Sequence, residues 1–536
     1  MEQSIAFDEQ NKIWSRSSKN NGVPLNSLIG PAILNRLKEM DKDKVLEINH
    51  ANGRETTVKE MYGMSVTCAK NLVNLGIQQG DIVAIIANLT YYTTPLCFGC
   101  FIQGAIVNPI PVTSTDEGFE HIMSYINPKI IIYETCFKDR IEKAIEKVKP
   151  SNLEYFICSN NDIENILFKP VDDIDSFTAP DLGDPSKIIA AMPLTSGSTG
   201  KQKAIQISHS FYMFGMMNWF ESFKGMRYYI GSNFGWMSQI AALAQPVFIE
   251  QVRIYSDNQP SGEYMAQVIY DTKATHFFSA SFAVPDLIEY CIANEKVHYL
   301  ASLRKLLTGG APIPQALYKE IETLLPNCQF ICGYGMTEMN GTIATDERLT
   351  NRDGVLLIPG LQLRILDTNR NPVGRNSMGK IELKPLNVNF LGYHNMDEVN
   401  KESFVDGWIS TGDYGAMNDQ NLLNVFGRYK DLIFCDEHVI IPSDIESIVA
   451  GLPQVKQVGV IAVPHTIEEK GQMVAIFIKL KSWYKETENQ TKKELTDVIR
   501  DKLNWQQIKG VYFLDDFPYL PSFKIDKQTL IRNFLK

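Results

Sequence analysis

The stretch that decides the fold is Leu194-Thr195-Ser196-Gly197-Ser198-Thr199-Gly200-Lys201-Gln202-Lys203, in which hydroxyls, glycines and lysines lie between apolar runs. Residues 188–192 before it are apolar and residues 204–208 after it alternate with period two, so we expect the loop to join two strands. Glycines let the backbone form a concave nest of N–H donors, while hydroxyls add donors and lysine adds charge. The stretch predicts a phosphate-binding loop, with a polar surface turn as the alternative.

A Walker-type phosphate loop is excluded by the spacing. Such a loop needs four residues between its first glycine and a Gly-Lys-Ser/Thr ending. Residues 197–202 read Gly-Ser-Thr-Gly-Lys-Gln and satisfy neither condition. We therefore expect any phosphate to be bound by a different kind of glycine-rich loop.

Length and charge narrow the class of protein. The chain has 536 residues, which is too long for one compact core, so two or more domains are expected. A formal net charge of −10 disfavours a general electrostatic role on nucleic acid or an anionic membrane. Any nucleotide that the protein binds is expected to be a small ligand.

The cysteines and the termini indicate an intracellular protein. Nine cysteines are scattered through apolar segments, as buried thiols are in a reducing compartment. Cys97 and Cys100 form a Cys-x-x-Cys, but its apolar surroundings favour core packing over redox or zinc chemistry. The N-terminus lacks the apolar core of a signal peptide, and the longest apolar run, residues 96–107, is shorter than the ~20 residues of a membrane span.

Strands and helices alternate along the chain from about Lys44. Residues 82–86 and 129–133 are continuous apolar runs typical of buried strands, and the apolar positions of residues 141–148 have helical spacing. This order predicts an α/β domain with a largely parallel sheet. Aromatic and methionine side chains are dense in residues 211–237, which we interpret as core packing, with an apolar substrate pocket as the alternative.

Several later segments place polar side chains beside glycine turns. The run Tyr334-Gly335-Met336-Thr337-Glu338 offers a ring for a base, a hydroxyl for phosphate and a carboxylate for Mg²⁺. Asp413 follows Gly412, where a carboxylate can accept the hydroxyls of a ribose. Lys524 lies in a loop near the end of a smaller α/β pattern. Taken singly, each is an ordinary loop or surface residue.

In their order along the chain, these motifs resemble the adenylate-forming (AMP-binding) enzyme superfamily, most of all the insect luciferase-like acyl-CoA synthetases and the coumarate-CoA ligases. The resemblance implies an α/β fold with a large multi-subdomain N-terminal domain, residues 1–429, and a small mobile α+β C-terminal domain, residues 430–536, with its hinge at Lys430. It also implies two half-reactions. A carboxylate attacks the α-phosphate of ATP to give acyl-adenylate and pyrophosphate, and the thiol of coenzyme A then displaces AMP.

The resemblance also assigns a role to each matched residue. Lys524 would bridge the attacking carboxylate and the α-phosphate, Thr337 would bind the α-phosphate, and Glu338 would hold Mg²⁺. The implied nucleotide contacts are Thr195, Ser196, Gly197, Ser198, Thr199, Gly200 and Lys203 for pyrophosphate, Gly309, Gly310, Ala311, Tyr334 and Gly335 for adenine, and Asp413 and Arg428 for ribose.

The end of the phosphate loop departs from the usual Gly-x-Pro-Lys-Gly but keeps its lysine, and three later positions depart from the family pattern as well. Phe434 stands where a second lysine is usual, and Glu437 stands where a glycine leaves room for the pantetheine arm. Phe523 replaces the glycine that usually precedes the catalytic lysine. The histidine-rich string of the acyl-binding region is not seen in residues 231–240, which argues against luciferase-type oxygenation. Adenylation is therefore better supported than either possible second step, which is transfer to coenzyme A or luciferase-type oxygenation.

The favoured hypothesis is an ATP- and Mg²⁺-dependent ligase that joins a fatty or aromatic acid to coenzyme A. Two alternatives stay open: an adenylating enzyme with another acceptor, and a catalytically weak nucleotide-binding relative. Relatives that act in fatty acid metabolism are often peroxisomal. The ending Phe534-Leu535-Lys536 lacks a Ser-Lys-Leu type address, which fits the cytoplasm instead. The sequence indicates neither the acid nor the oligomeric state.

Overall fold

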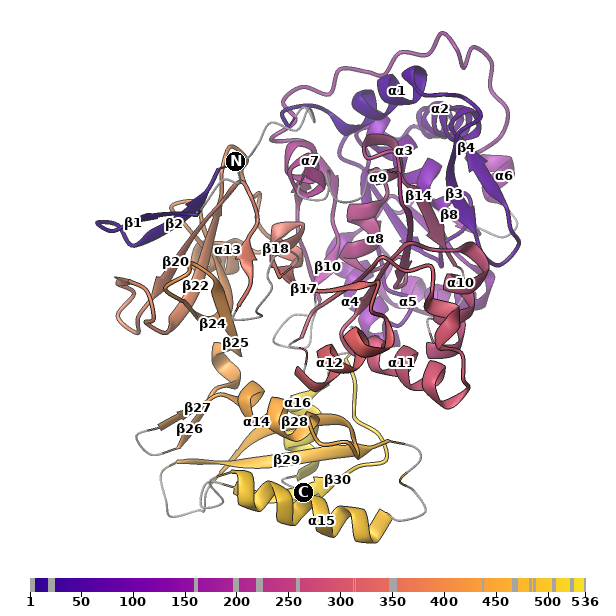
Figure 1. The fold of residues 1–536 in the computed structure, drawn as a ribbon. Coiled ribbons are helices and arrows are strands. Elements are labelled where there is room, and N and C mark those ends of the chain that lie inside the picture. Colours follow the sequence, from indigo (N-terminus) through magenta and orange to yellow (C-terminus); the bar gives the residue numbers. More distant parts are fainter. Residues whose placement is uncertain are drawn as a thin grey trace.

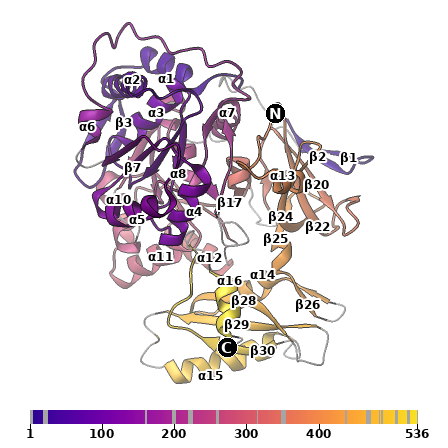
Figure 2. The same ribbon diagram turned by 180° about the vertical axis from the view of Figure 1, so that it is seen from behind.

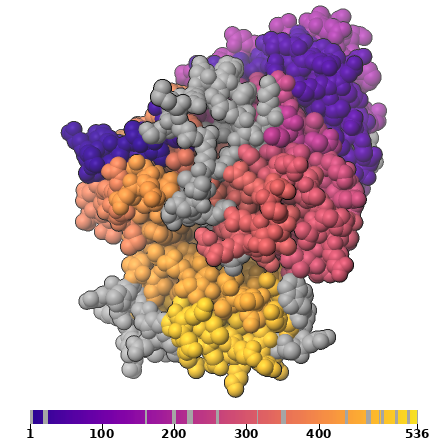
Figure 3. Space-filling model, viewed as in Figure 1, coloured from indigo at the N-terminus to yellow at the C-terminus, as the bar shows by residue number. Residues whose placement is uncertain are grey.

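The computed structural model divides the chain into a large lobe built on three large sheets and a small lobe at one end (Figure 1). In the space-filling view the small lobe, orange to yellow, forms the lower end of the molecule (Figure 3). The residues whose structure is described are 5–17, 25–158, 162–195, 202–217, 225–256, 261–311, 313, 315–346, 354–435, 438–464, 471–481, 484, 488–503, 508–520 and 525–534.

A six-stranded sheet with the strand order β12-β9-β6-β5-β7-β8 has mostly parallel pairs. Strand β5 (Ile82–Ile86) is buried along its whole length, as expected for an apolar run in a covered parallel sheet. The predicted strands near 82–86 and 129–133 and the predicted helix near 141–148 are confirmed. The neighbouring elements are β6 (Ile106–Pro109), β7 (Ile130–Tyr133), β8 (Tyr155–Cys158), β9 (Ile189–Ala191), β12 (Ile207–Ser208), α3 (Thr93–Gln103), α4 (Asp116–Ile126), η1 (Thr135–Phe137), α5 (Lys138–Val148) and α6 (Ile163–Ile166).

A nine-stranded sheet with the order β19-β18-β17-β16-β15-β13-β14-β3-β4 is parallel from β17 to β3. Its strands are β3 (Val45–Asn49), β4 (Glu55–Thr57), β13 (Arg227–Gly231), β14 (Val252–Tyr255), β15 (His276–Ala280), β16 (Lys305–Gly309), β17 (Gln329–Met336), β18 (Gly341–Thr345) and β19 (Leu356–Leu357). The helices around it are α1 (Ile29–Glu39), α2 (Val58–Asn74), α7 (His209–Met217), α8 (Met237–Ala242), α9 (Gln245–Phe248), α10 (Gly262–Thr272), α11 (Ala283–Ala293), η2 (Val297–Leu300), α12 (Gln315–Leu324) and η3 (Thr337–Met339).

The third sheet of the large lobe has eight antiparallel strands, and β1 and β2 lie at its outer edge (Figure 2). Its strands are β1 (Ala6–Asp8), β2 (Ile13–Arg16), β20 (Leu361–Leu366), β21 (Pro372–Val373), β22 (Gly379–Pro385), β23 (Phe404–Val405), β24 (Trp408–Met417) and β25 (Leu423–Arg428), with α13 (Asp397–Ser403) beside it. This sheet brings residues from both ends of the large lobe's sequence together.

The small lobe follows η4 (Tyr429–Asp431), and Ile433 is the first residue whose side chain is buried in its core. Its elements are β26 (Ile433–Cys435), β27 (His438–Ile440), α14 (Pro442–Ala450), β28 (Val455–Pro464), β29 (Gln472–Leu480), α15 (Glu488–Lys502), β30 (Ile508–Phe513) and α16 (Lys527–Phe534). The mixed pairing of β28, β29 and β30 fits the expected α+β domain. The boundary at Lys430 stays a prediction.

Ion pairs of Lys456 join the two lobes. The Lys456 ammonium at the start of β28 lies 2.9 Å from Asp286 and 3.0 Å from Glu289, both on α11 of the large lobe. The Lys456 side chain is about one quarter exposed, so this pair is partly shielded from solvent. The small lobe therefore docks on the helix that directly follows β15.

A buried ion pair links two strands of the nine-stranded sheet. Glu47 of β3 and Arg253 of β14 are register partners, and each side chain is 1% exposed. Arg253 Nη1 donates to Glu47 Oε1 at 2.7 Å, and Thr94 of α3 donates to the same oxygen at 2.7 Å. Arg253 Nη2 donates to Gln239 of α8, whose amide holds the carbonyl oxygens of Ile230 and Ser232. The pair thus connects the sheet, two helices and the end of β13.

Lowering the pH below about 6.5 is expected to destabilise the fold through His209. Burial lowers the pKa of His209 from 6.5 to about 3, and Nδ1 accepts a hydrogen bond from Ile29 N–H. Between these two values the unfolded chain binds a proton that the folded chain does not, so stability falls by about 1.4 kcal/mol per pH unit. Urea midpoints measured against pH should show this slope reduced in His209→Asn, which keeps an acceptor for Ile29. The same slope in His209→Asn as in the wild-type protein would contradict the assignment, and exposed His298→Asn serves as the control.

The predicted core packing of Cys97 and Cys100 is confirmed, because both thiols are buried and unpaired, and burial raises the pKa of Cys100 to about 12. The side chains from Phe211 to Phe214 are buried as well, as the core interpretation predicts. Within the described ranges, no helix combines the length and the apolar character needed to cross a bilayer. The peroxisomal or cytoplasmic location stays a prediction.

Candidate functional site

The site lies where the parallel strands of the nine-stranded sheet end. The register places Ala280 beside Gly309 and Gly309 beside Gly333, so β15 and β16 end at the same level, whereas β17 continues to Met336 and pairs there with β18. Open α/β sheets bind ligands at the carboxyl ends of their strands. The apolar runs of β16 and β17 stop at Gly309 and Gly333, which brings the predicted adenine and phosphate segments to one edge.

Two of the predicted adenine-site glycines are required by the backbone. A Cβ at Gly309 would lie 2.7 Å from the carbonyl oxygen of Gly333, so only glycine fits between these strands. Gly310 has a φ of +97°, in the left-handed region that favours glycine, and among the described residues beyond its chain neighbours none has an atom within 4 Å of the position of its Cβ. Ala311 follows on the exposed side of the turn. The turn leaves the strand end open toward solvent.

Tyr334, Asp413 and Arg428 form one hydrogen-bonded group. The Tyr334 hydroxyl donates to Asp413 Oδ2 at 2.6 Å, and Arg428 Nε lies 3.2 Å from Asp413 Oδ1. Arg428 Nη1 also donates to the carbonyl oxygen of Thr411 at 2.6 Å. Burial, and then the Asp413 carboxylate, raise the pKa of Tyr334, so its hydroxyl stays a donor. The group fixes the Asp413 side chain, whose residue is 7% exposed, against Tyr334 of the predicted adenine site.

The strand pairing of the third sheet positions this group. Asp413 of β24 is the register partner of Arg428 on β25, so the two side chains meet across the strands. Gly412 has a φ of +73°, and a Cβ there would lie 3.1 Å from Arg428 Nη1. Although desolvation opposes the effect, the Asp413 and Glu338 carboxylates raise the pKa of Arg428. The positive charge of Arg428 therefore interacts both with Asp413 of the predicted ribose site and with Glu338 of the predicted magnesium site.

The predicted phosphate loop connects two short antiparallel strands, β10 (Leu194–Thr195) and β11 (Lys203–Ala204), in which Thr195 pairs with Lys203. This confirms that the loop joins two strands. The apolar and polar alternation of residues 204–208 is divided between β11 and β12, because β12 pairs with β9 instead of β10. Ser196, Gly197, Ser198, Thr199 and Gly200 lie outside the described residues, so their contacts with phosphate stay a prediction.

Lys203 and Glu338 meet at a tyrosine that the sequence interpretation missed. The Tyr393 hydroxyl donates to Glu338 Oε1 at 2.7 Å, and Lys203 Nζ lies 5.2 Å from the centre of the Tyr393 ring. Thr337 precedes Glu338 in η3, and Gly335 lies in β17, where a Cβ would approach the Gly341 carbonyl oxygen to 2.4 Å. A glycine followed by a tyrosine at 392–393 repeats the Gly-Tyr pattern of 333–334 and is the signal that was available.

The remaining predicted residues belong to the small lobe and its connection. Lys430 lies in η4, between the two lobes. Lys524 and Phe523 lie outside the described residues, although Tyr519 before them and Ile525 after them pair with each other. Glu437 is outside them too, whereas Phe434 is described and is 46% exposed on β26. Its cross-strand partner Val439 is 47% exposed.

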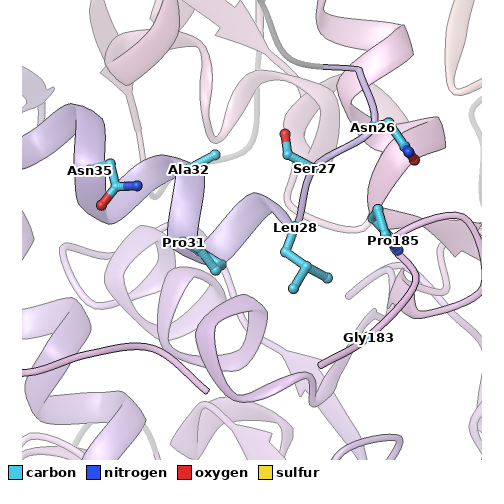
Figure 4. A pocket seen from close by; sticks show the side chains of 8 residues that line it. All are labelled: Asn26, Ser27, Leu28, Pro31, Ala32, Asn35, Gly183 and Pro185. Atoms are coloured by element: carbon cyan, nitrogen blue, oxygen red, sulfur yellow. The ribbon is translucent and has the colours of Figure 1, made fainter. Parts of the chain in front are cut away.

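A shallow pocket of about 390 Å³ lies elsewhere, at the start of α1 (Figure 4). None of its lining residues is charged, and none belongs to the predicted site. They are Asn26, Ser27, Leu28, Pro31, Ala32, Asn35, Gly183 and Pro185. The lining residues therefore offer no charged side chain that would neutralise a phosphate or activate a carboxylate.

Comparison with known sequences decides the family. The profile of the AMP-binding enzyme matches residues 36–394, and that of the AMP-binding enzyme C-terminal domain matches residues 444–524. The chain belongs to the AMP-binding enzyme family. The resemblance drawn from the ordered motifs is thereby confirmed, as is the fold with a large N-terminal and a small C-terminal domain.

Two curated relatives align with most of this AMP-binding enzyme. The 2-succinylbenzoate–CoA ligase of Oceanobacillus iheyensis is 28% identical over 464 residues, which cover 84% of this chain and 89% of the relative. The 4-coumarate–CoA ligase 2 of Petroselinum crispum is 24% identical over 533 residues, which cover 91% of each. The predicted similarity to coumarate-CoA ligases is confirmed.

Two solved structures share the fold of this AMP-binding enzyme. The anthranilate CoA ligase AuaEII in complex with anthranoyl-AMP superposes with a TM-score of 0.85 at 19% identity, covering 97% of this chain and 99% of that chain. The luciferase-like enzyme from the nonluminescent Zophobas morio mealworm superposes with a TM-score of 0.70 at 24% identity, covering 79% and 98%. At such identities the likeness concerns the fold.

Proposed function

We propose that the protein is an ATP- and Mg²⁺-dependent acid–thiol ligase, which activates a fatty or aromatic carboxylic acid as its acyl-adenylate and transfers the acyl group to coenzyme A. The observation that carries the proposal is the convergence of two groups at one sheet edge. Tyr334 and Arg428 hold Asp413, while Tyr393 contacts both Lys203 and Glu338. The relatives named above, which are CoA ligases, support the same chemistry.

Each half-reaction makes one bond and breaks another. In the first, an oxygen of the acid bonds to the α-phosphorus of ATP and pyrophosphate leaves. Thr337 and Lys524 would stabilise the charge at that phosphorus, and Lys203 would neutralise the leaving group. In the second, the coenzyme A sulfur bonds to the acyl carbon, its proton is lost and AMP leaves. Asp413 and Arg428 would hold the ribose throughout, with Tyr334 beside the base.

The residues present fit a magnesium ion. Mg²⁺ prefers oxygen ligands and is commonly held by one or two carboxylates together with substrate phosphates, not by an all-protein cage. Glu338 supplies such a carboxylate, and the Tyr393 hydroxyl already fixes one of its oxygens. When bound, the ion would offset charge on the phosphates. Glu338 would be its ligand from this chain.

A hydroxamate assay separates the half-reactions. The protein is incubated with ATP, magnesium chloride, hydroxylamine and each acid of a panel that includes 4-coumarate, 2-succinylbenzoate, anthranilate and long-chain fatty acids. The proposal expects hydroxamate and pyrophosphate with at least one acid, and acyl-CoA when coenzyme A replaces hydroxylamine. Hydroxamate without thioester would support an acceptor other than coenzyme A. Neither product with any acid would support a catalytically weak relative.

The β26–β27 hairpin favours the second candidate, an adenylating enzyme with another acceptor. Phe434 presents an exposed ring where the family usually has a lysine, and Glu437 stands where a glycine is usual. An apolar ring and an added carboxylate suit the polar, negatively charged coenzyme A poorly. A less charged thiol or amine would meet neither obstacle.

Restoring the usual residues is expected to raise thioester formation. Phe434→Lys with Glu437→Gly should increase acyl-CoA production roughly ten- to hundred-fold, the effect of one hydrogen bond to a charged group. The rate of adenylate formation should stay within about two-fold. Val439→Lys places the same charge on the neighbouring strand and serves as the matched control. An equal gain in Val439→Lys, or no gain in the double variant, would contradict this account.

A further inference from the structure

The segment around Tyr393 runs alongside the outgoing strand of the phosphate loop. Gln206 N–H donates to the carbonyl oxygen of Gly392 at 3.0 Å, and His394 N–H donates to the carbonyl oxygen of Ala204 at 2.9 Å. Ile205 and Tyr393 face each other as an isolated antiparallel bridge. The backbone on both sides of Tyr393 is therefore hydrogen-bonded to the residues that follow the phosphate loop.

The Asn400 side chain fixes the Tyr393 backbone from the opposite side. Asn400 Oδ1 accepts from Tyr393 N–H at 2.7 Å, and Asn400 Nδ2 donates to the Tyr393 carbonyl oxygen at 2.8 Å. Gly392 has a φ of +91°, and a Cβ there would lie 2.9 Å from the same amide. Both polar groups of the Tyr393 backbone are thus satisfied, and the direction of its side chain is set before any ligand binds.

The Tyr393 side chain contacts the two charged groups at the phosphate end of the site. Its hydroxyl donates to Glu338, and its ring lies under the Lys203 ammonium, within the range of a cation–π contact. Phe404 packs against the ring at a centroid distance of 5.7 Å.

We propose that Tyr393 is a positioning residue for the magnesium–triphosphate end of the site, orienting the Glu338 carboxylate through its hydroxyl and the Lys203 ammonium through its ring. This proposal rests on the nucleotide-binding part of the function proposed above. Glutamate and lysine have several freely rotating bonds, so holding both in place before ATP binds lowers the entropy cost of binding. Residues that orient a metal-ligating carboxylate typically contribute about ten- to hundred-fold in metal affinity or activity. We expect an effect on the order of ten- to hundred-fold for Tyr393 as well.

The test is Tyr393→Phe, which removes the hydroxyl and keeps the ring. We expect the magnesium concentration that gives half-maximal adenylation to rise roughly ten-fold, with the KM for the acid unchanged. Calorimetric titration supplies a readout without turnover. ATP binding should weaken about ten-fold in magnesium chloride and stay unchanged in EDTA, because the hydroxyl acts through the metal ligand. In Tyr393→Leu, which also lacks the ring, binding should weaken in EDTA as well, through Lys203.

A control variant and the outcomes that would contradict the proposal complete the test. Tyr290→Phe, on α11, removes another tyrosine hydroxyl that donates to an exposed carboxylate, that of Glu263 on α10, and it should leave both titrations unchanged. An equal loss of ATP binding with and without magnesium in Tyr393→Phe would indicate general damage and overturn the proposal, as would no loss. If the wild-type protein binds ATP in a magnesium-dependent way but forms no hydroxamate, the proposed ligase function is wrong. The titrations would still test the role of Tyr393 in that case. No magnesium-dependent binding by the wild-type protein would overturn both.

Discussion

Replacing Lys524 with alanine is expected to lower the rate of acyl-adenylate formation by roughly 10²–10³-fold and to leave the fold intact. In the proposed first half-reaction, the attacking carboxylate and the α-phosphate carry like charges, and the barrier rises if no cation lies between them. Removing a positioned donor of this kind commonly costs on the order of 3–4 kcal/mol of barrier. Pyrophosphate exchange with the best acid of the panel measures this step.

The Lys524 experiment distinguishes the missing cation from damage to the small lobe. Lys527→Ala is the matched control, because Lys527 lies three positions further on and pairs with Glu446 of the same lobe at 3.0 Å. It should retain adenylation within a few-fold. Supplying synthetic acyl-adenylate should restore acyl-CoA formation in Lys524→Ala, since the second half-reaction does not need the missing cation. Pyrophosphate exchange near the wild-type rate would disprove the role of Lys524.

Patterns that are local in the sequence predicted their parts of the molecule well. The apolar run of residues 82–86 became the buried centre of a parallel sheet, because an uninterrupted apolar strand needs cover on both faces. Gly309 and Gly310, which the resemblance assigned to the adenine site, follow one another at the end of β16, and the register places Gly309 beside Gly333. Tyr334 and Asp413 were each identified from a neighbouring glycine. Their direct hydrogen bond was not predicted, because 79 positions separate them.

Contacts between distant segments could not be read from such patterns. Tyr393 and Glu338 are 55 positions apart, and the same Gly-Tyr pair in a loop without Glu338 nearby would carry no chemistry. Arg253 and Glu47 are 206 positions apart, and a charged residue inside a short strand normally indicates a solvent-facing side. Only the pairing of β14 with β3, covered by helices, shows that both charges are buried. Sheet order is therefore the information that the sequence patterns lacked.

Arg253→Met is expected to be the most destabilising of the substitutions considered, at about 3–5 kcal/mol, because it leaves the Glu47 carboxylate buried without its cation. The midpoint of urea unfolding, followed by circular dichroism, measures the effect. Arg370→Met removes an arginine that is 60% exposed and pairs with Glu382, and it should cost less than about 1 kcal/mol. This control separates the loss of an ion pair in general from the loss of the partner of a buried charge.

The double variant Glu47→Met with Arg253→Met decides between charge and packing. If the uncompensated carboxylate causes the loss, removing it as well should recover most of the stability, since apolar side chains of similar volume often replace a buried pair without cost. If packing is the cause, the double variant should be at least as unstable as Arg253→Met. Gln239 loses its Arg253 partner in both variants, and it holds the backbone at the end of β13, next to the strands that form the site. A double variant that regains stability and still adenylates slowly would therefore show that the network also orients this strand end, whereas full activity would restrict its role to the fold.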